Sequence, residues 1–251
     1  MPALLRISLW LALTALSAAA SASALDEILR CNAEALGGEA AFERVGNLRI
    51  ELDIREPGFE VTATYVATRA GYMRIDITAG GQRVFAEGLD SARAWQWTPE
   101  AGVTTSSAAG AAALRNGVES PGRFYTLRQL RDRGARLELV EPGPLARPEE
   151  WQLRLIRDDG SVIDHFIDRE SCLPTRELSR RALHPDVDST EVLIETVHSE
   201  PFTVDGLLRF RRDEQRNVES GEWLGTTALR SVEHNLSLPE GFFRPGVQPA
   251  K

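Results

Sequence analysis

Apolar and polar residues alternate in several consecutive runs between Asn47 and Thr98. Side chains of a β-strand point to opposite faces in turn, so each alternating run predicts a strand with one apolar and one polar face. The apolar positions are Leu48, Ile50, Leu52 and Ile54, then Phe59, Val61, Ala63, Tyr65 and Ala67, then Met73, Ile75 and Ile77. The connections are too short for the crossover that parallel strands need. Five antiparallel strands with one apolar side are therefore predicted.

The pattern on either side of this segment completes a mainly β protein with a few helices. Apolar residues at helical spacing predict a helix at Leu25–Leu36, ended by Gly37 and Gly38, and a short second helix at Glu39–Val45. Further strand-like runs lie at Arg136–Val140, Trp151–Arg157, Val162–Asp168, Leu173–Ala182, Ser189–Ser199, Val204–Arg212 and Gly221–Leu236. The chain therefore has about eleven predicted strands, enough for one antiparallel sheet to curl. No repeat or linker divides it, so residues 25–251 are expected to form a single domain.

The segment between Gly102 and Gly134 breaks the alternation. Its first half is rich in Ala, Ser, Thr and Gly, and predicts a mobile loop with a small-residue helix near Ala108–Leu114. A second helical stretch begins at Pro121. Two interpretations stay open: a plain connection across the sheet, or a lid over a cavity, because long loops without a core of their own are usually functional or disordered.

The first residues have the features of a secretory signal. Arg6 supplies the positive charge, Ile7–Leu16 is a short apolar run, and a small-residue box precedes a predicted cleavage site after Ala24. The apolar run is shorter than the roughly 20 residues that span a membrane. No cysteine directly follows the cleavage site, so residues from Leu25 onward are expected to form a soluble, exported protein.

Charge limits the classes of partner. The chain has 29 Lys and Arg against 37 Asp and Glu, and its formal net charge is −8. Nucleic acids and anionic membrane surfaces attract basic patches, so neither is an expected partner. The arginines are scattered, and solvated faces account for them best.

Two cysteines, Cys31 and Cys172, are present. An even count in an exported chain favours a structural disulfide, which would join the first helix to the far half of the sheet. A catalytic or redox pair is the alternative, although neither cysteine lies in a C-x-x-C motif or beside a histidine.

The sequence lacks the motifs of common enzymes and cofactor sites. The four histidines form no H-E-x-x-H pair, and there is no G-x-S-x-G elbow, phosphate loop or G-x-G-x-x-G. We therefore predict no metal, no cofactor and no catalytic residues. Active sites can also be built from residues far apart in sequence. A hydrolase would require a cleft in which histidine and carboxylate groups converge.

Several short strings, in order, carry a resemblance to a known family. They are ATRAGYMRID at Ala67–Asp76, VFAEGLDSARAWQWTP at Val84–Pro99, LPEGFFRPGVQP near the end, and DRESCLPTRE and VDGLLRF between them. Together with the order of elements, they resemble the periplasmic lipoprotein carriers of the LolA/LolB type and their lipoprotein-sorting-like relatives. Arg69 stands at the family's arginine, with Ala70 in place of the usual proline.

The resemblance implies a strongly curved antiparallel sheet, an unclosed half-barrel, with helices over its concave face. The carriers hold acyl chains between sheet and helices, so the implied partners are a lipid or acylated protein and an envelope membrane protein, in the periplasm. In the family the arginine hydrogen-bonds the lid and keeps it closed without ligand, a role that Arg69 would take here.

The sequence leaves three functions open. In the first, a carrier, the apolar strand positions Ile50, Leu52, Ile54, Val61, Tyr65, Met73, Ile75 and Trp95 line a lipid cavity, or else form ordinary core. Each buried CH₂ contributes about 0.8 kcal/mol, so an acyl chain would bind well. The second is an envelope sensor or protein-interaction module on the same scaffold with a filled interior. The third is the hydrolase described above.

Overall fold

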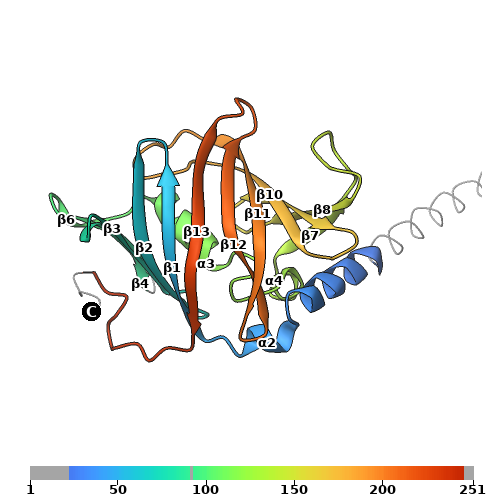
Figure 1. Cartoon of the computed structure of the whole chain (residues 1–251), viewed down its shortest axis with the longest axis horizontal. Helices are drawn as coiled ribbons and strands as arrows, with labels where there is room; N and C mark the ends of the chain where they lie inside the picture. The colour runs from blue at the N-terminus through green and yellow to red at the C-terminus, as the bar shows by residue number, and fades with distance from the viewer. Residues whose placement is uncertain (1–22, 91–92, 246–251) are drawn as a thin grey trace, which may run out of the picture.

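The computed structural model describes residues 23–90 and 93–245. Within them, thirteen strands form one antiparallel sheet in the order β6-β5-β4-β3-β2-β1-β13-β12-β11-β10-β9-β8-β7. The strands are β1 Asn47–Glu56, β2 Phe59–Thr68, β3 Met73–Ala79, β4 Gln82–Asp90, β5 Arg93–Thr98, β6 Gly102–Thr105, β7 Arg136–Val140, β8 Glu150–Ile156, β9 Val162–Asp168, β10 Pro174–Arg181, β11 Val192–Val204, β12 Leu207–Asn217 and β13 Trp223–His234. Figure 1 shows the first and last strands side by side in the middle of the sheet.

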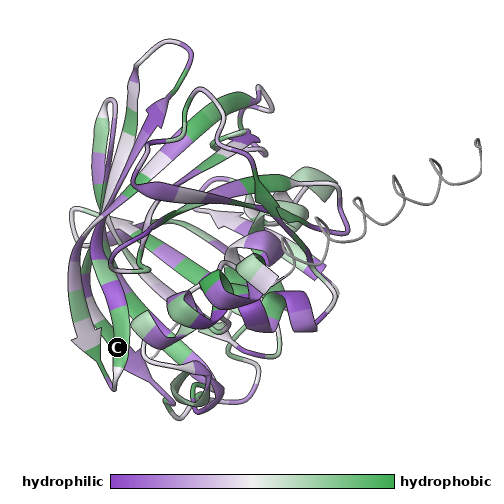
Figure 2. Cartoon of the chain, turned by 90° about the vertical axis from the view of Figure 1, so that its right-hand side faces the viewer, coloured by the Kyte–Doolittle hydropathy of each residue, from purple (hydrophilic) through white to green (hydrophobic). Residues whose placement is uncertain are grey.

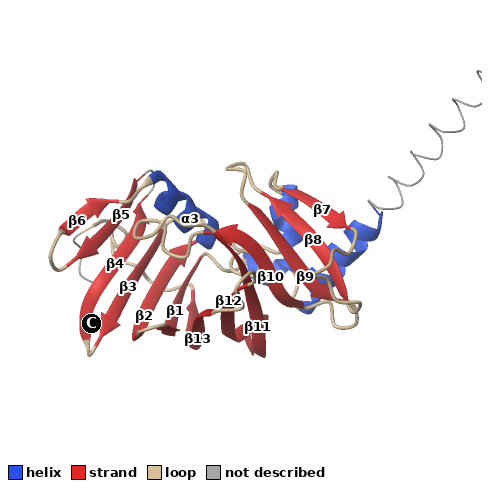
Figure 3. Cartoon of the chain, turned by 90° about the horizontal axis from the view of Figure 1, so that it is seen from above, coloured by secondary structure: helices blue, strands red, loops and turns tan. Residues whose placement is uncertain are grey.

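The sheet is bent but not closed. Seen from above, its strands form an open trough, with α3 (Ala108–Val118) lying inside it (Figure 3). β6 and β7 are the two edges, and they do not pair with each other. The predicted unclosed, mainly β architecture is therefore confirmed. We call the face that carries the helices the inner face, and the opposite one the outer face.

The register follows from the alternation. Ile50 of β1 lies opposite Tyr65 of β2 on one side and Val232 of β13 on the other, so apolar residues of three strands meet on the inner face. Green and purple positions alternate along the strands in Figure 2 for the same reason. A shift of one residue would turn every apolar side chain outward, so this face fixes the pairing.

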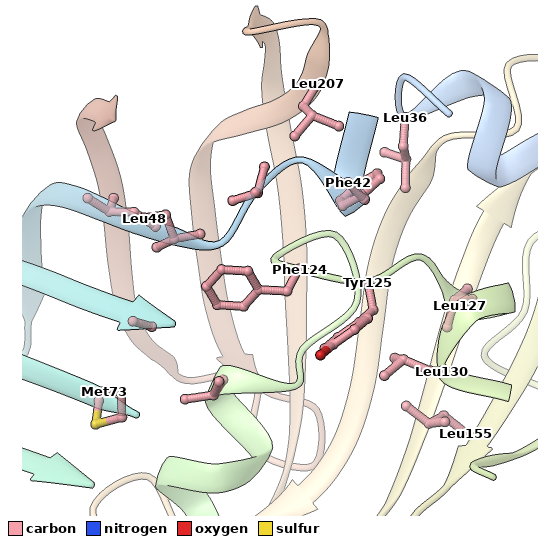
Figure 4. Packing of buried hydrophobic residues seen from close by; sticks show 14 of the residues in the cluster. Leu36, Phe42, Leu48, Met73, Phe124, Tyr125, Leu127, Leu130, Leu155 and Leu207 are labelled. Carbon is pink, nitrogen blue, oxygen red and sulfur yellow. The ribbon is translucent and has the colours of Figure 1, made fainter. Parts of the chain in front are cut away.

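Helices and a long connection cover the inner face. They are a helix over residues 23–35, α2 (Glu39–Glu43), α3 and α4 (Leu127–Asp132). Phe124 and Tyr125, in the connection between α3 and α4, are buried, and Phe124 points toward Leu48 of β1 (Figure 4). Together they form the main core with Phe42 of α2. The protein therefore fills most of the inner face over β1–β3 with its own side chains.

Two details differ from the sequence prediction. The loop predicted from Gly102 onward begins with the edge strand β6, whose Trp97↔Val103 pairing with β5 alternation alone did not reveal. The helical stretch predicted from Pro121 begins only at Leu127. Thr126 caps it there through a reciprocal pair of hydrogen bonds with Gln129. The segment before Thr126 is an irregular connection packed on the sheet.

A disulfide joins Cys31, in the helix over residues 23–35, to Cys172 in the turn between β9 and β10. Asn32 adds a buried hydrogen bond of 2.9 Å from its amide to the Cys172 carbonyl. Because the cross-link closes a sequence separation of 141 residues, it restricts the unfolded chain strongly. The helix is therefore held against the β7–β10 half of the sheet.

The predicted signal segment, residues 1–24, lies almost wholly outside the described residues, so cleavage after Ala24 stays a prediction. Over the part of the chain that the structure describes, none of the helices has the length and apolar character needed to cross a membrane.

Candidate functional site

A cavity of about 640 Å³ lies on the inner face, between the sheet and α3. Its floor comes from β1 and β9–β13. Its roof is the alanine-rich side of α3, where Ala109, Ala112 and Ala113 face the space. Small side chains at these roof positions leave volume that larger ones would fill. Ligand pockets in proteins commonly have volumes of about 300–1,000 Å³, so the space suits a small molecule or an acyl chain.

α3 is fixed at both ends by polar contacts from the opposite half of the sheet. At its start, the Asp186 carboxylate, in the β10–β11 connection, accepts a hydrogen bond of 2.8 Å from the Ser107 backbone N–H and another from Gln96 of β5. Near its end, the Asn116 amide donates to Asp159, in the β8–β9 turn, over 2.8 Å. The roof thus spans the trough: Leu114 and Val118 on its buried side belong to the main core, and hydrogen bonds hold its two ends.

One part of the floor is apolar. Leu48 and Ile50 of β1, Leu229 and Val232 of β13, and Phe210 of β12 line it. These residues are neighbours through the β1–β13 register, in which Ile50 lies opposite Val232 and Leu52 opposite Leu229. This apolar part could bury a hydrocarbon chain.

The other part of the floor is polar. His165 of β9 lies opposite Glu177 of β10, which lies opposite Thr196 of β11, which in turn lies opposite Gln215 of β12. This row of four cross-strand neighbours lines the cavity. His198 lies opposite Asp213 in the adjacent row. We call these six residues the polar floor.

The pKa values of the two histidines of the polar floor are shifted in opposite directions. Burial lowers the pKa of His165 to about 4, although the Glu177 carboxylate, 3.6 Å from its Nδ1, opposes this. Burial also acts to lower the pKa of His198. There the hydrogen bond of 2.8 Å to Asp213 and the charge of that carboxylate outweigh burial, and the pKa is raised. At neutral pH, His165 is therefore neutral, and His198 is the more readily protonated of the two.

Three polar atoms around this floor have no hydrogen-bond partner within the described residues: His165 Nε2, Thr196 Oγ1 and Arg157 Nη2. His165 and Thr196 are each only 4% exposed, and Arg157 follows β8. All three residues line the cavity. Buried polar groups in proteins are nearly always paired, so three unpaired atoms in one place point to a missing partner such as a guest or water.

Arg69 joins three segments of the inner face. Its guanidinium donates to the backbone carbonyls of Val45 (3.0 Å), Phe42 and Phe124 (2.7 Å), and stacks 4.6 Å from the centre of the Tyr125 ring. Phe124 belongs to the connection between α3 and α4. The contact is therefore of the kind implied for a lid-closing arginine; that role itself is a proposal.

Of the eight residues predicted to line a cavity, Ile50 lines this one. Tyr65 and Met73 are buried in the core, and Leu52 and Ile75 pack against it. Ile54 and Val61 are half-buried, at the far end of β1 and β2. The space lies over β9–β13 instead, because the segment from α3 to α4 covers the β1–β3 part.

The prediction that Trp95 shares the inner face was wrong. Trp95 lies opposite Gly88, which lies opposite Arg74, and this row is on the outer face, since Met73 and Ile75 are on the inner one. There the Trp95 indole donates a hydrogen bond of 2.9 Å to the carbonyl of Phe243, in the C-terminal segment. A large apolar side chain can lie at this outer-face position because the C-terminal segment covers it.

Sequence reasoning also missed the polar floor. His165 and His198 belong to no local motif, so no role was predicted for them. A usable signal was present: His165 has the same parity as Ile163 and Ile167, so it falls on an apolar face. The pairings that join it to Glu177 and Thr196 depend on register between strands, which alternation does not provide.

No family model and no curated protein sequence matches this chain. Three solved structures match its fold with a TM-score of 0.53 each. A DUF1329 family protein from Desulfovibrio piger is 13% identical, with 86% of this chain and 96% of that one covered. A LolA superfamily protein from Nitrosomonas europaea is 12% identical, with 84% and 96% covered. The fold is LolA-like. A candidate outer membrane lipoprotein-sorting protein domain from Vibrio parahaemolyticus is 10% identical, with 82% and 93% covered.

These matches confirm the predicted resemblance at the level of the fold. The matches cover 82–86% of this chain, so the shared fold accounts for most of it. Identities of 10–13% say nothing of the ligand. The function must therefore be argued from the cavity itself.

The convergence of histidine and carboxylate groups, the condition set for a hydrolase, is present in the cavity. A nucleophilic mechanism needs in addition a hydroxyl or thiol hydrogen-bonded to the imidazole. The Thr196 hydroxyl and His165 Nε2 have no such partner within the described residues. Over residues 23–90 and 93–245, no group of three His, Cys, Asp or Glu side chains is placed to bind a metal either.

Proposed function

We propose that this chain is an exported, periplasmic binding or carrier protein that holds a lipid, or the acyl chains of a lipoprotein, between its curved sheet and α3. It acts without catalysis and without a cofactor. The observation that carries the proposal is the cavity of about 640 Å³ with an apolar floor next to a polar one. Such a space matches an amphiphile, whose two ends have different solvation needs.

The energetics support reversible binding. Burying each CH₂ of a chain contributes about 0.8 kcal/mol, and the ordering of guest and roof cancels much of this gain. A carrier must also release its cargo. The two ends of the roof are held by the contacts of Asp186 and Asn116, hydrogen bonds that can break and re-form.

Arg69 fits this scheme as the residue that holds the α3–α4 connection. Its bonds to the carbonyls of Phe42 and Phe124 join α2 to the connection that follows the roof helix. We propose that these bonds favour the closed arrangement when no guest is present. Ile50 is the one member of the predicted lining set that would touch the guest.

The test is uptake of a fluorescent fatty acid by the purified mature protein, together with mass spectrometry of co-purified lipids. Saturable uptake is expected. Ala112→Trp, which places an indole in the cavity roof, is expected to weaken uptake at least ten-fold. Ala108→Trp is the matched control, because Ala108 is an exposed residue of the same helix and does not line the cavity.

Two outcomes would contradict the proposal. One is the absence of both uptake and co-purified acyl chains. The other is equal uptake by Ala112→Trp and the wild type, which would place the guest elsewhere. Urea unfolding of both variants separates loss of binding from loss of fold. No hydrolysis of acyl esters is expected, and turnover that His198→Phe abolishes would support the hydrolase instead.

A further inference from the structure

We propose that the polar floor is a subsite for an uncharged, hydroxyl-bearing headgroup, such as the glycerol of a monoacylglycerol, whose chain lies on the apolar floor. This inference rests on the proposed function, since it names the class of amphiphile that the same cavity would select. It is argued from the three unpaired atoms, from the charges around them and from the position of the apolar floor.

The three unpaired atoms form one group. His165 and Thr196 are both cross-strand neighbours of Glu177, so the atoms lie on either side of one carboxylate. Arg157 interacts electrostatically with the same Glu177 and with His165. A single small group placed over β10 could therefore reach all three.

The hydrogen-bonding types of these atoms are mixed. His165 is neutral, and the Glu177 carboxylate beside Nδ1 favours the tautomer with its proton there, which leaves Nε2 as an acceptor. Arg157 Nη2 can only donate, and the Thr196 hydroxyl can do both. A guest that satisfies the group must supply both a donor and an acceptor. Hydroxyl groups do so, whereas an ionised carboxylate or phosphate diester only accepts.

Carboxylates of the protein already face the charged groups around these atoms. The Glu177 carboxylate interacts with two cationic side chains, Arg157 and Arg181, and the Asp213 carboxylate is hydrogen-bonded to His198. An added negative charge would face those carboxylates in a buried place, which is costly. A neutral headgroup avoids this cost.

The apolar floor is continuous with the polar one. Asp213 of the polar floor lies on β12, as does Phe210, and β12 pairs with β13, which supplies Leu229 and Val232. A chain attached to a headgroup over β10 and β11 can therefore extend toward Phe210, Leu229 and Val232 on the neighbouring strands. The cavity thus fixes both the position of the guest's polar headgroup and the direction in which its chain runs.

The experiment compares three ligands with the same 12-carbon chain: monolauroylglycerol, lauric acid and lauroyl lysophosphatidylglycerol. Each displaces a fluorescent alkyl probe from the full mature protein below its micelle concentration. We expect monolauroylglycerol to bind tightest. Thr196→Val keeps the shape and removes one hydroxyl, and is expected to weaken monolauroylglycerol about five-fold.

Thr62→Val is the matched control, because it makes the same change on the outer face, where Thr62 donates to the Thr78 carbonyl. His165→Phe removes the proposed acceptor Nε2, and its affinity for monolauroylglycerol is a second test of the subsite. Tighter binding of either anionic ligand, or equal affinity of Thr196→Val and wild type for monolauroylglycerol, overturns this inference while probe binding still supports a carrier. Failure of every ligand and of the probe to bind overturns the carrier proposal itself.

Discussion

Single arginine side chains hold the irregular parts of this protein together. Arg69 is the main example, since its guanidinium satisfies carbonyls at the end of α2 and in the α3–α4 connection. Those segments have neither strand nor helix partners at these points, so the arginine replaces backbone pairing. The fork of five donors on a guanidinium makes this possible, and a lysine could not reproduce it.

Replacing Arg69 by leucine should therefore loosen the cover over the core. The change leaves the carbonyls of Val45 and Phe124 without their donor. We expect a loss of about 1–3 kcal/mol in the free energy of unfolding, measured in urea. Arg55→Leu is the control. Arg55 is exposed and pairs only with exposed Glu60, so a change within about 0.5 kcal/mol is expected. Equal effects of the two substitutions would contradict this role for Arg69.

His165 shows where residue-level reading of the sequence ends. It alternates in step with Ile163, a signal for an apolar face that was not used, and a buried histidine and a solvated one look alike until their neighbours are known. Those neighbours, Glu177 and Thr196, come from two other strands. Trp95 shows the reverse: its apolar character was read correctly, but its face depends on the pairing with Gly88.

At the scale of elements, α3 is the part whose position decides whether the cavity is covered. It has few large side chains, and its start is set by contacts with Asp186. Gly110 explains why the carboxylate can approach: a Cβ atom at this position would lie 2.2 Å from Asp186 Oδ2. Glycine is thus required for packing, at a site where helix propensity favours alanine.

Gly110→Ala should displace the Asp186 carboxylate and with it the hydrogen bonds to Ser107 and Gln96. We expect the free energy of unfolding to fall by about 1–2 kcal/mol. Gly117→Ala is a matched control in the same helix, because a Cβ there would meet nothing within 4 Å. It is expected to stabilise by about 0.5–1 kcal/mol. Stabilisation by both alanines would show that the Asp186 contact contributes nothing.

Most of the elements could be predicted from the sequence because each strand has an apolar face of its own. The alternation at Asn47–Thr98 gave β1 to β5, and the small-residue run gave α3. The edge strand β6 was missed because it has only four residues and pairs with a neighbouring strand on one side alone. The cavity lies over β1 and β9–β13, whereas the predicted lining residues came from β1, β2, β3 and β5. The part of the inner face that is filled depends on where the bulky side chains of Phe124 and Tyr125 pack. The alternation pattern of the strands carries no information on this.

For the whole molecule, the trough brings acidic groups together under the β10–β11 connection. Glu87 of β4 lies opposite Ile75 and Gln96 on the inner face. Burial, with the charge of Asp186, raises the pKa of Glu87 to about 7, and the charge of His184 opposes this only in part. His184 itself pairs with Glu56 over 2.9 Å, a contact that raises the pKa of the imidazole. The stability of the closed trough should therefore depend on pH.

The direction of this dependence follows from proton binding. The ordinary pKa of Glu87 is 4.5 and the folded one is about 7, so between these values the folded state binds more protons than the unfolded state. The contribution of Glu87 to stability is present below about pH 4.5 and is lost as the pH rises through 7. His165 acts in the opposite sense. Its folded pKa of about 4 lies below the ordinary 6.5, so stability rises with pH between these values.

The two slopes overlap between about pH 4.5 and 6.5 and oppose each other, so the wild type should show a shallow profile there. Glu87→Gln removes one slope. The difference in free energy of unfolding between the variant and the wild type should grow by about 1–3 kcal/mol as the pH is raised from 5 to 8. The variant's own free energy of unfolding should rise with pH through pH 6. Urea unfolding at a series of pH values measures both. Glu60→Gln, at an exposed position on β2, should follow the wild type. A Glu87→Gln profile parallel to that of the wild type would mean that Glu87 is ionised in the folded protein, and that Asp186 covers it less closely than the structure indicates.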